Sequence, residues 1–289
     1  MTTVLEVIDK GTAYLEKRNI ENARLNMQLL VAHHLGCSRM DLYLRFDEPL
    51  TDEQLQPIRS HLKQRGERIP LQHLLGSVEF CRREFKTDSR ALIPRPETEE
   101  LVSLILHQAH TLNKPTRLLD LGTGSGILGI TLALELPQVS EAVLSDISPD
   151  ALALAQENAA THQAEFTLIE SNLFQNLTGT FDLIVANLPY VPEIDRPTLA
   201  PELAHDPDLA LFSGPDGLDL LRQFIPLALQ HLNPNGLLAL EIGHNQHEKI
   251  AELLKSSEFQ EIDIRSDLSG ISRFPFARKP EPKTTQSSA

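Results

Sequence analysis

Three closely spaced glycines follow a short apolar run that is typical of a buried strand. The run Arg117–Leu121 leads into Gly122, Gly124 and Gly126, and a helical pattern begins directly afterwards. Glycines let the backbone turn tightly and approach a ligand closely, and the start of a helix offers unpaired N–H donors. This succession of strand, glycine loop and helix predicts a binding site for a nucleoside cofactor.

Two aspartates stand at the ends of the first two predicted strands. Asp120 precedes the glycine loop, and Asp146 ends the second strand, where a carboxylate can accept hydrogen bonds from both hydroxyls of a ribose. Gly124, Gly126 and Gly129 satisfy the dinucleotide pattern G-x-G-x-x-G, so the loop alone leaves a dinucleotide and S-adenosylmethionine both open. Asp120 favours the methyl donor, because its carboxylate would serve a cationic amino-acid moiety, directly or through water, but would repel a pyrophosphate.

An asparagine follows the buried strand Phe181–Ala186, at the sheet edge where open α/β folds bind ligands. The nitrogen of an amide or an aromatic amine is a poor nucleophile, because its lone pair is delocalised. The Asn187 side-chain oxygen and the Leu188 backbone carbonyl would accept its two hydrogens and hold it facing a methyl sulfonium. Pro189 would fix the turn, and Tyr190 would form an aromatic wall. The motif predicts methyl transfer to a planar nitrogen by positioning and charge stabilisation, without a strong base.

Short apolar strands alternate with helices over most of the remaining chain, which predicts a mostly parallel sheet covered on both faces. The predicted strands are Arg117–Leu121, Ala142–Asp146, Phe166–Glu170, Phe181–Ala186, Leu237–Ile242, Glu261–Ser266 and Arg273–Ala277. The predicted helices between them are Ile127–Leu136, Pro149–Ala160, Leu218–His231 and Gln246–Ser256. Only a loop separates the last two strands, so one of them is predicted to run antiparallel at the sheet edge.

The first part of the chain has a different pattern of apolar residues from the rest. Its apolar residues recur at helical spacing, and Thr51 with Gln54 forms a capping-box pattern. The predicted parts are a helical substrate-recognition domain over residues 1–75, a β-hairpin linker over 76–94, a catalytic domain over 95–279 and a disordered tail over 280–289.

Composition and charge exclude several classes of protein. The 289 residues carry 26 Lys and Arg against 40 Asp and Glu, a net charge of −14. Residues 1–90 are nearly neutral, with 14 basic and 13 acidic side chains, whereas residues 91–289 have 12 and 27. This balance argues against extended nucleic-acid binding. Cys37 and Cys81 have no metal-ligand spacing, and no apolar run is long enough to span a membrane. We expect no metal, no membrane partner, a cytoplasmic location and a monomer.

Several motifs together are similar to those of peptide chain release factor glutamine methyltransferases, a class I S-adenosylmethionine-dependent family. The resemblance runs through nearly the whole chain to about Lys279, and is most specific in Ala91–Val102. The other matching segments are Arg65–Pro70, Gly76, Asp120–Gly126, Phe181–Tyr190, Pro201–Leu203, Asp206–Pro207, Ala210–Phe212, Gly214–Leu218 and Leu240–Gly243. The resemblance implies a Rossmann-like, seven-stranded α/β fold and methylation of the glutamine side chain in the Gly-Gly-Gln loop of a release factor.

The family motifs also imply roles for particular residues. The implied cofactor-binding residues are Asp120, Gly122, Thr123, Gly124, Ser125, Gly126, Asp146, Ile147, Asn172, Leu173 and Asn187. Asn187, Leu188, Pro189 and Tyr190 are implied to bind the substrate, and Asn187, Pro189 and Tyr190 to serve catalysis. Arg95 and Glu97 are candidates for contacts near the methionine end of the cofactor, although Glu97 is equally explained as an acid in the first turn of a helix.

Two positions depart from the family pattern and leave alternatives open. Leu188 stands where the family usually has proline, and Asn172 where it commonly has aspartate. The resulting Asn-Leu-Pro-Tyr is also similar to the motif of ribosomal RNA adenine dimethyltransferases. Glutamine methylation of a ribosomal protein and adenine methylation of RNA or DNA are therefore the alternative activities. A binding module that has lost methyl transfer is disfavoured by the intact Asn187 and Tyr190.

Overall fold

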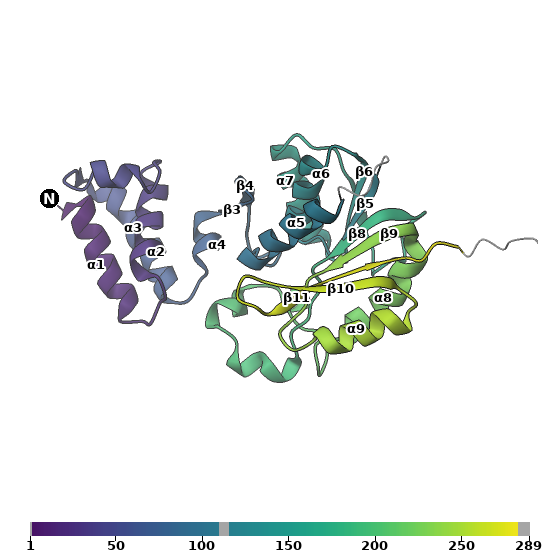
Figure 1. Cartoon of the computed structure of the whole chain (residues 1–289). Coiled ribbons are helices and arrows are strands. Elements are labelled where there is room, and N and C mark those ends of the chain that lie inside the picture. The colour runs from purple at the N-terminus through teal and green to yellow at the C-terminus, as the bar shows by residue number, and fades with distance from the viewer. Residues whose placement is uncertain (1, 110–115, 283–289) are drawn as a thin grey trace, which may run out of the picture. The chain divides into compact units, whose positions relative to one another are not determined.

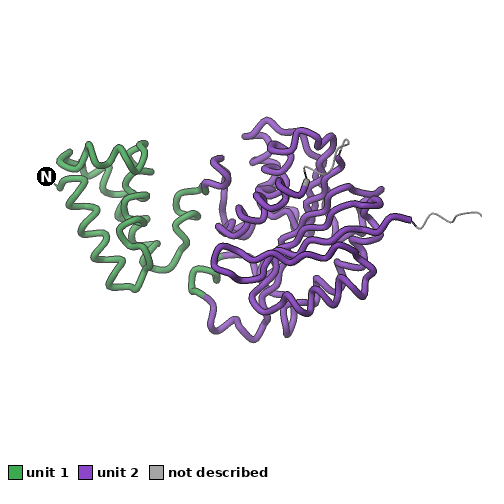
Figure 2. Tube along the Cα trace, viewed as in Figure 1, with its two compact units in different colours: residues 1–78, 200–205 green, residues 79–199, 206–289 purple. Residues whose placement is uncertain are grey.

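A computed structural model describes residues 2–109 and 116–282, which form two compact units (Figures 1 and 2). Unit 1 comprises residues 1–78 and 200–205, and unit 2 comprises residues 79–199 and 206–289. Most of the tail predicted to be disordered, from residue 283 onward, lies outside the described residues.

Unit 1 is a helical body around an apolar core that includes Val4, Ile8, Met27 and Ile58. Its elements are β1 (Thr2–Thr3), α1 (Val4–Glu16), α2 (Ala23–His34), η1 (Asp41–Leu44), β2 (Pro49–Leu50), α3 (Asp52–Gly66), α4 (Leu71–Leu75) and η3 (Pro201–His205). The predicted capping box is present: the Thr51 hydroxyl accepts from the N–H of Gln54, whose side chain accepts from the N–H of Thr51. Among the described residues of the predicted helical domain, 1–75, the pairing of β1 with β2 is the one departure from an all-helical body.

A distant segment of the chain completes unit 1. Glu202, in η3, accepts hydrogen bonds from an arginine in the last turn of α3 and from one just after it: its Oε1 lies 3.0 Å from Arg65 Nη1 and 3.2 Å from Arg68 Nη1. Arg65 is buried and also donates to the side chain of Asn26 at 2.7 Å. Because more than a hundred positions separate Glu202 from these arginines, no local pattern in the sequence predicts the contact.

Unit 2 contains the predicted seven-stranded, mostly parallel sheet, in the order β10-β11-β9-β8-β5-β6-β7. Its strands are β5 (Thr116–Leu121), β6 (Val139–Asp146), β7 (Thr167–Glu170), β8 (Phe181–Ala186), β9 (Leu232–Leu240), β10 (Gln260–Ser266) and β11 (Ser272–Arg278). The prediction of an antiparallel strand at the edge is wrong in its position. The antiparallel strand is β11, which lies between β9 and β10, so the edge strand β10 runs in the direction of the others.

Strand β9 differs most from its predicted limits, because it begins at Leu232 and ends at Leu240, instead of running from Leu237 to Ile242. The register against β8 passes from Phe181 opposite Leu232 to Leu183 opposite Leu237. Residues 233–236 therefore form a bulge, with Asn235 at a φ of 61°. A bulge places unpaired residues inside a strand, and its asparagines, proline and glycine read locally as a turn.

Helices cover both faces of the sheet, with α5, α6 and α7 on one side and α8 and α9 on the other (Figure 1). The helices and short elements of unit 2 are α5 (Pro96–Ala109), α6 (Ile127–Glu135), α7 (Pro149–Thr161), η2 (Glu193–Thr198), η4 (Asp208–Ala210), α8 (Asp219–His231) and α9 (His247–Ser256). A two-stranded sheet, β3 (Ser77–Phe80) with β4 (Arg83–Lys86), occupies the predicted hairpin region.

The centre of the sheet decides where a ligand can bind. Strand β5 pairs with β6 on one side and with β8 on the other, so the chain winds outward in both directions from β5 and β8. Asp120 on β5 lies opposite Val185 on β8. Ligands of open α/β sheets bind beyond the carboxyl ends of strands at such a reversal. The pairing therefore brings the glycine loop and Asn187 together, although 60 positions separate them.

Candidate active site

The glycine loop joins β5 to α6 and depends on positive backbone angles. The φ values are 73° at Gly122, 55° at Gly124 and 81° at Gly126, a region that residues with a Cβ rarely adopt. A side chain at Gly122 would also clash with its neighbour, because a Cβ there would lie 2.7 Å from the Leu188 side chain. The N–H groups of Gly122 and Thr123 donate to the Ser145 carbonyl on β6. The loop is thus a preformed backbone cradle fixed to the neighbouring strand.

Asp120 lies beneath this loop and is almost completely buried. Its Oδ2 accepts from the Thr123 hydroxyl at 2.6 Å and from the Gly129 N–H at 2.9 Å. Burial raises the pKa of Asp120 to about 6, although both hydrogen bonds act in the opposite direction. The carboxylate therefore joins the end of β5, the loop and the first turns of α6, and a contact with the cofactor stays a prediction.

Asp146 ends β6 beside the same loop. Its Oδ2 accepts from the Gly124 N–H at 2.9 Å, and its Oδ1 accepts from the Ser148 N–H at 2.9 Å. Burial raises the pKa of this carboxyl. Two hydrogen bonds fix its orientation at the pocket wall next to Ile147, which is exposed. This is the position at which a carboxylate would meet the hydroxyls of a ribose.

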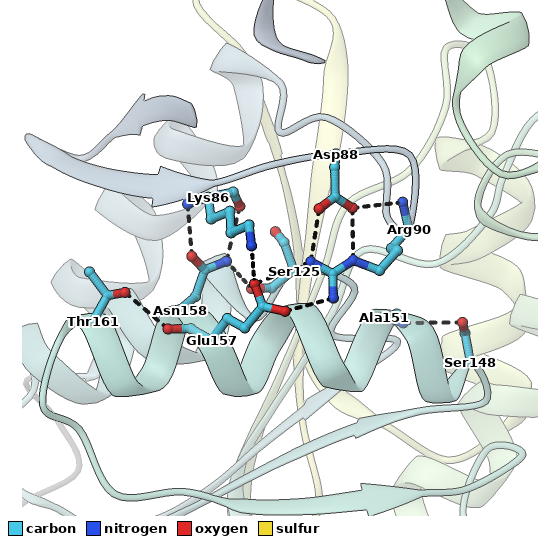
Figure 3. A network of polar contacts seen from close by, with 9 residues as sticks. All are labelled: Lys86, Asp88, Arg90, Ser125, Ser148, Ala151, Glu157, Asn158 and Thr161. Atoms are coloured by element: carbon cyan, nitrogen blue, oxygen red, sulfur yellow. Dashed lines mark hydrogen bonds and ion pairs between the residues drawn. The ribbon is translucent and has the colours of Figure 1, made fainter. Parts of the chain in front are cut away.

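A polar network holds the other wall of the pocket against α7 (Figure 3). The guanidinium of Arg90 is bound by Asp88 and by Glu157, with Nη1 2.8 Å from Glu157 Oε1. Asn158 is fully buried and accepts from the Lys86 N–H at 2.8 Å while donating to the carbonyls of Lys86 and of Ser125. One side chain of α7 thus ties the end of β4 to the glycine loop.

The Asn187–Tyr190 segment is supported by residues from α5, from the position after β9 and from the N-cap of α9. Asn187 Nδ2 donates to Thr98 Oγ1 at 3.4 Å, and the Tyr190 hydroxyl donates to Glu241 Oε1 at 3.3 Å. Gln246 Nε2 donates to the Tyr190 carbonyl at 2.9 Å. Burial raises the pKa of the Tyr190 phenol, and nearby Glu241 raises it further, so the phenol stays protonated.

These parts enclose one pocket in unit 2. Its lining includes Gly122, Gly124, Asp146, Ile147, Asn172, Leu173, Asn187, Leu188 and Pro189 from the residues predicted by sequence. Seven others lie outside that lining: Asp120, Thr123, Ser125, Gly126, Tyr190, Arg95 and Glu97. Tyr190 is half-buried, and its hydroxyl is bonded to Glu241. Arg95 contacts Asp206 at 3.5 Å, and Glu97 stands in the first turn of α5.

Sequence reasoning missed several lining residues. These are Arg90, Ala91, Leu92, Leu121, Ser148, Ala151, Ser171, Pro207, Leu209, Ala210 and Leu220. Ala91 and Pro207 lie in segments that resemble the family, but the resemblance gave them no role. Thr98 and Glu241, which support Asn187 and Tyr190, were also missed: they lie in the matching segments Ala91–Val102 and Leu240–Gly243, but the resemblance gave neither of them a role.

The part of the chain that the structure describes has no cluster of three His, Cys, Asp or Glu side chains able to hold a metal ion. Nor does any helix within the described ranges have the length and apolar character needed to cross a membrane.

Comparison with known proteins identifies the family. Residues 6–76 match the PrmC N-terminal domain, and residues 100–214 match the methyltransferase small domain. A release factor glutamine methyltransferase of Deinococcus radiodurans is 39% identical, covering 95% of this chain and 98% of that protein. One from Geobacter sulfurreducens is 40% identical, covering 94% and 95%. This chain belongs to the release factor glutamine methyltransferase family. It is therefore a methyltransferase that depends on S-adenosylmethionine.

The fold agrees with this assignment. The solved structure of a T. thermophilus 16S rRNA N2 G1207 methyltransferase aligns with a TM-score of 0.50 at 20% identity, covering 70% of this chain and 49% of that one. The donors of the pocket also fit the cofactor, because the site combines a glycine cradle that a Cβ would fill with an oriented carboxylate at the end of β6. In this family, these are the groups that we expect to hold the nucleoside.

Replacing Asp146 by alanine is expected to weaken binding of S-adenosylmethionine ten- to a hundredfold. Loss of a charged hydrogen-bond acceptor costs on the order of 1.5–3 kcal/mol. Calorimetric titration measures the change, and Asp150→Ala is the matched control, because Asp150 is an exposed acid in the first turn of α7 outside the pocket lining. Equal affinities for wild type and Asp146→Ala would show that the ribose is held elsewhere.

Replacing Asp120 by asparagine is expected to change how stability depends on pH. With a pKa raised to about 6, the folded protein binds this proton more tightly than the unfolded chain. Ionisation therefore costs the wild type roughly 3 kcal/mol of stability as the pH rises from about 4 to 6. Asp120→Asn has no such cost, so urea unfolding should show its stability relative to wild type increasing over this range.

Asp267→Asn provides a control of opposite sign for the pH experiment. Burial alone would raise the pKa of Asp267, but the N–H of Ile271 and the guanidinium of Arg273 outweigh burial and lower it. Because the pKa of Asp267 is lowered, the wild type gains stability relative to Asp267→Asn as the pH rises through the range in which an ordinary aspartate ionises. A flat difference for Asp120→Asn between pH 4 and 7 would contradict the raised pKa.

Proposed function

We propose that this chain transfers the methyl group of S-adenosylmethionine to the side-chain amide nitrogen of the glutamine in the Gly-Gly-Gln motif of peptide chain release factors. Relatives of nearly equal length carry the name release factor glutamine methyltransferase. The observation that carries the proposal is the meeting of two motifs: Asn187, at the end of β8, lines the same pocket as the glycine loop after β5.

The cofactor half of the pocket acts through fixed hydrogen-bonding groups. When bound, S-adenosylmethionine supplies an electrophilic methyl group on a sulfonium. The loop N–H groups and the Asp146 carboxylate would orient its nucleoside, and Ile147 would pack against the base. Asn172 and Leu173, at the end of β7, would complete the base site, with the Asn172 oxygen accepting from the adenine amine. Asp120 would hold the loop from below.

The substrate half acts by orientation. The side-chain oxygen of Asn187 and the backbone carbonyl of Leu188 would accept the two hydrogens of the glutamine amide. Accepting both hydrogens aims the nitrogen at the methyl group and stabilises the positive charge that develops on it. The N–CH3 bond would form as the S–CH3 bond breaks, and the nitrogen would release one of its two protons to solvent to give the neutral methylamide. A leucine preserves the carbonyl that proline provides in the usual motif, and its side chain is buried against Gly122.

We assign recognition of the rest of the release factor to the helical N-terminal domain, residues 1–75. This domain carries the exposed apolar side chains Met40, Tyr43 and Leu44, which lie in and beside η1. Its near-neutral charge also distinguishes it from the acidic remainder. We further place the enzyme in the cytoplasm, because Cys37 and Cys81 are both free thiols, as expected in a reducing compartment. We favour a monomer as its working form.

Asn187→Ala is expected to slow methyl transfer about a hundredfold or more with little change in cofactor affinity. One N–H of the substrate loses its acceptor, and the amide is no longer aimed at the methyl group. Single-turnover assays with saturating S-adenosylmethionine measure the rate, and mass spectrometry of the release factor locates the added methyl group.

Leu188→Pro is the companion variant, because it keeps the second carbonyl and restores the usual motif. We expect it to retain activity. A normal rate for Asn187→Ala would remove this residue from the mechanism. Modification of a ribosomal protein or of adenine in nucleic acid, with an unmodified release factor, would replace the proposed substrate by one of the alternatives.

A short peptide containing Gly-Gly-Gln is expected to be a much poorer substrate than the intact release factor, mainly through a higher KM. The peptide reaches the pocket but lacks the surfaces that residues 1–75 would recognise. The double variant Tyr43→Ser, Leu44→Ser should raise the KM for the intact factor while leaving peptide methylation unchanged. Equal KM values for the factor with wild type and the double variant would exclude these side chains from recognition.

A further inference from the structure

An asparagine can present either an oxygen or an NH2 group to its substrate, and only the oxygen accepts the hydrogens of an amide. The two orientations have the same shape, so hydrogen bonds must select one. Asn187 has such a partner on one side: its Nδ2 donates to Thr98 Oγ1 at 3.4 Å. The hydroxyl of Thr98 then donates to Glu241 Oε2 at 2.7 Å.

Glu241 sets the direction of this chain of hydrogen bonds. Its carboxylate is 1% exposed and accepts from two hydroxyls, Thr98 at one oxygen and Tyr190 at the other. An ionised carboxylate has no hydrogen to donate, so both hydroxyl hydrogens point toward it. The Thr98 oxygen then turns its lone pairs to Asn187, where an NH2 group is satisfied and an amide oxygen would be repelled.

We propose that Thr98 and Glu241 are positioning residues that fix the Asn187 amide with its oxygen toward the substrate. The inference rests on the proposed function and deepens it, because it assigns the support on which the Asn187 acceptor depends. Thr98 comes from the first turns of α5, and Glu241 follows β9. Residues outside the Asn187–Tyr190 segment therefore decide which atom of the Asn187 amide faces the substrate. The same carboxylate holds the Tyr190 hydroxyl.

The surroundings of Glu241 make the hydrogen bonds among Glu241, Thr98 and Asn187 sensitive to pH. Burial raises the pKa of Glu241 and the charge of Glu97 adds to the rise, while the hydroxyls of Thr98 and Tyr190 and the guanidinium of Arg273 oppose it. Arg95 also faces the Tyr190 phenol. Protonated Glu241 becomes a donor, and the chain of hydrogen bonds loses its fixed direction. Activity should therefore fall on the acid side at a higher pH than an ordinary glutamate would cause.

Thr98→Val tests the proposal, because valine keeps the shape of threonine and removes the hydroxyl. We expect kcat to fall between tenfold and a hundredfold while KM for the cofactor and its calorimetric affinity stay within about twofold of wild type. Thr98→Ser should restore kcat. Thr131→Val is the matched control: Thr131 is fully buried, and its hydroxyl has no hydrogen-bond partner among the residues that the structure describes. A Thr98→Val enzyme with the kcat of wild type would overturn the proposal.

Glu241→Gln provides a second, independent readout if Thr98→Val does not fold. Its pH–rate profile should lack the acid limb that Glu241 gives the wild type, and an unchanged limb would also overturn the proposal. The side-chain amide NMR signal of Asn187, assigned by its absence in Asn187→Ala, reports orientation without any reaction. It should coincide in wild type and Thr98→Ser and shift in Thr98→Val, whereas an identical signal in all three contradicts the hydrogen bond. If the wild type fails to methylate release factors, the proposed function fails while this NMR comparison still decides the orientation.

Discussion

The pocket depends on one buried carboxylate at the end of the central strand. Asp120 accepts from the Thr123 hydroxyl and from the Gly129 N–H, so a single oxygen joins β5, the glycine loop and α6. The cost of burying this charge appears in its raised pKa. Gly129 is part of the same constraint, because a Cβ there would lie 2.3 Å from Leu144 and 2.8 Å from the Asp120 side chain. Close contact of helix and sheet therefore keeps the carboxylate in place and the loop open to a ligand.

The rest of the site is distributed over the carboxyl ends of neighbouring parallel strands. Asp146 comes from β6, Asn187 from β8 and Glu241 from the end of β9, and the pairing of β5 with β8 places the loop beside Asn187. Each of these predicted site residues is held by hydrogen bonds: backbone N–H groups hold Asp146, Thr98 bonds Asn187, and Glu241 bonds Thr98 and Tyr190. A reaction that relies on orientation instead of a strong base needs such rigid partners, because small displacements of the reacting groups reduce the rate greatly.

The two compact units of this methyltransferase differ in the features that they carry. The pocket is lined by residues of unit 2, and its glycine loop beside the Asp146 carboxylate suits a small cofactor. Unit 1 contributes a separate helical body with exposed apolar side chains. The segment 200–205 belongs to unit 1 through Glu202, while Pro207, Leu209 and Ala210, a few positions further along the chain, line the pocket. The stretch from residue 200 to residue 210 therefore contributes residues to unit 1 and to the pocket of unit 2.

The sequence by itself determined the fold class and the cofactor, and it predicted the glycine loop, Asp146 and Asn187 as site residues, because each is a local pattern of residue types beside a strand. The limits of Phe181–Ala186 agree with the structure for the same reason, since a continuous apolar run has clear ends. Tertiary structure alone decided the place of β11 between β9 and β10, the bulge in β9 and the hydrogen bonds of Glu202 with two arginines. It also decided which side chains support Asn187. Those features depend on pairing and on contacts between distant positions, and a buried threonine or glutamate acquires its role only when folding brings its partner within hydrogen-bonding distance.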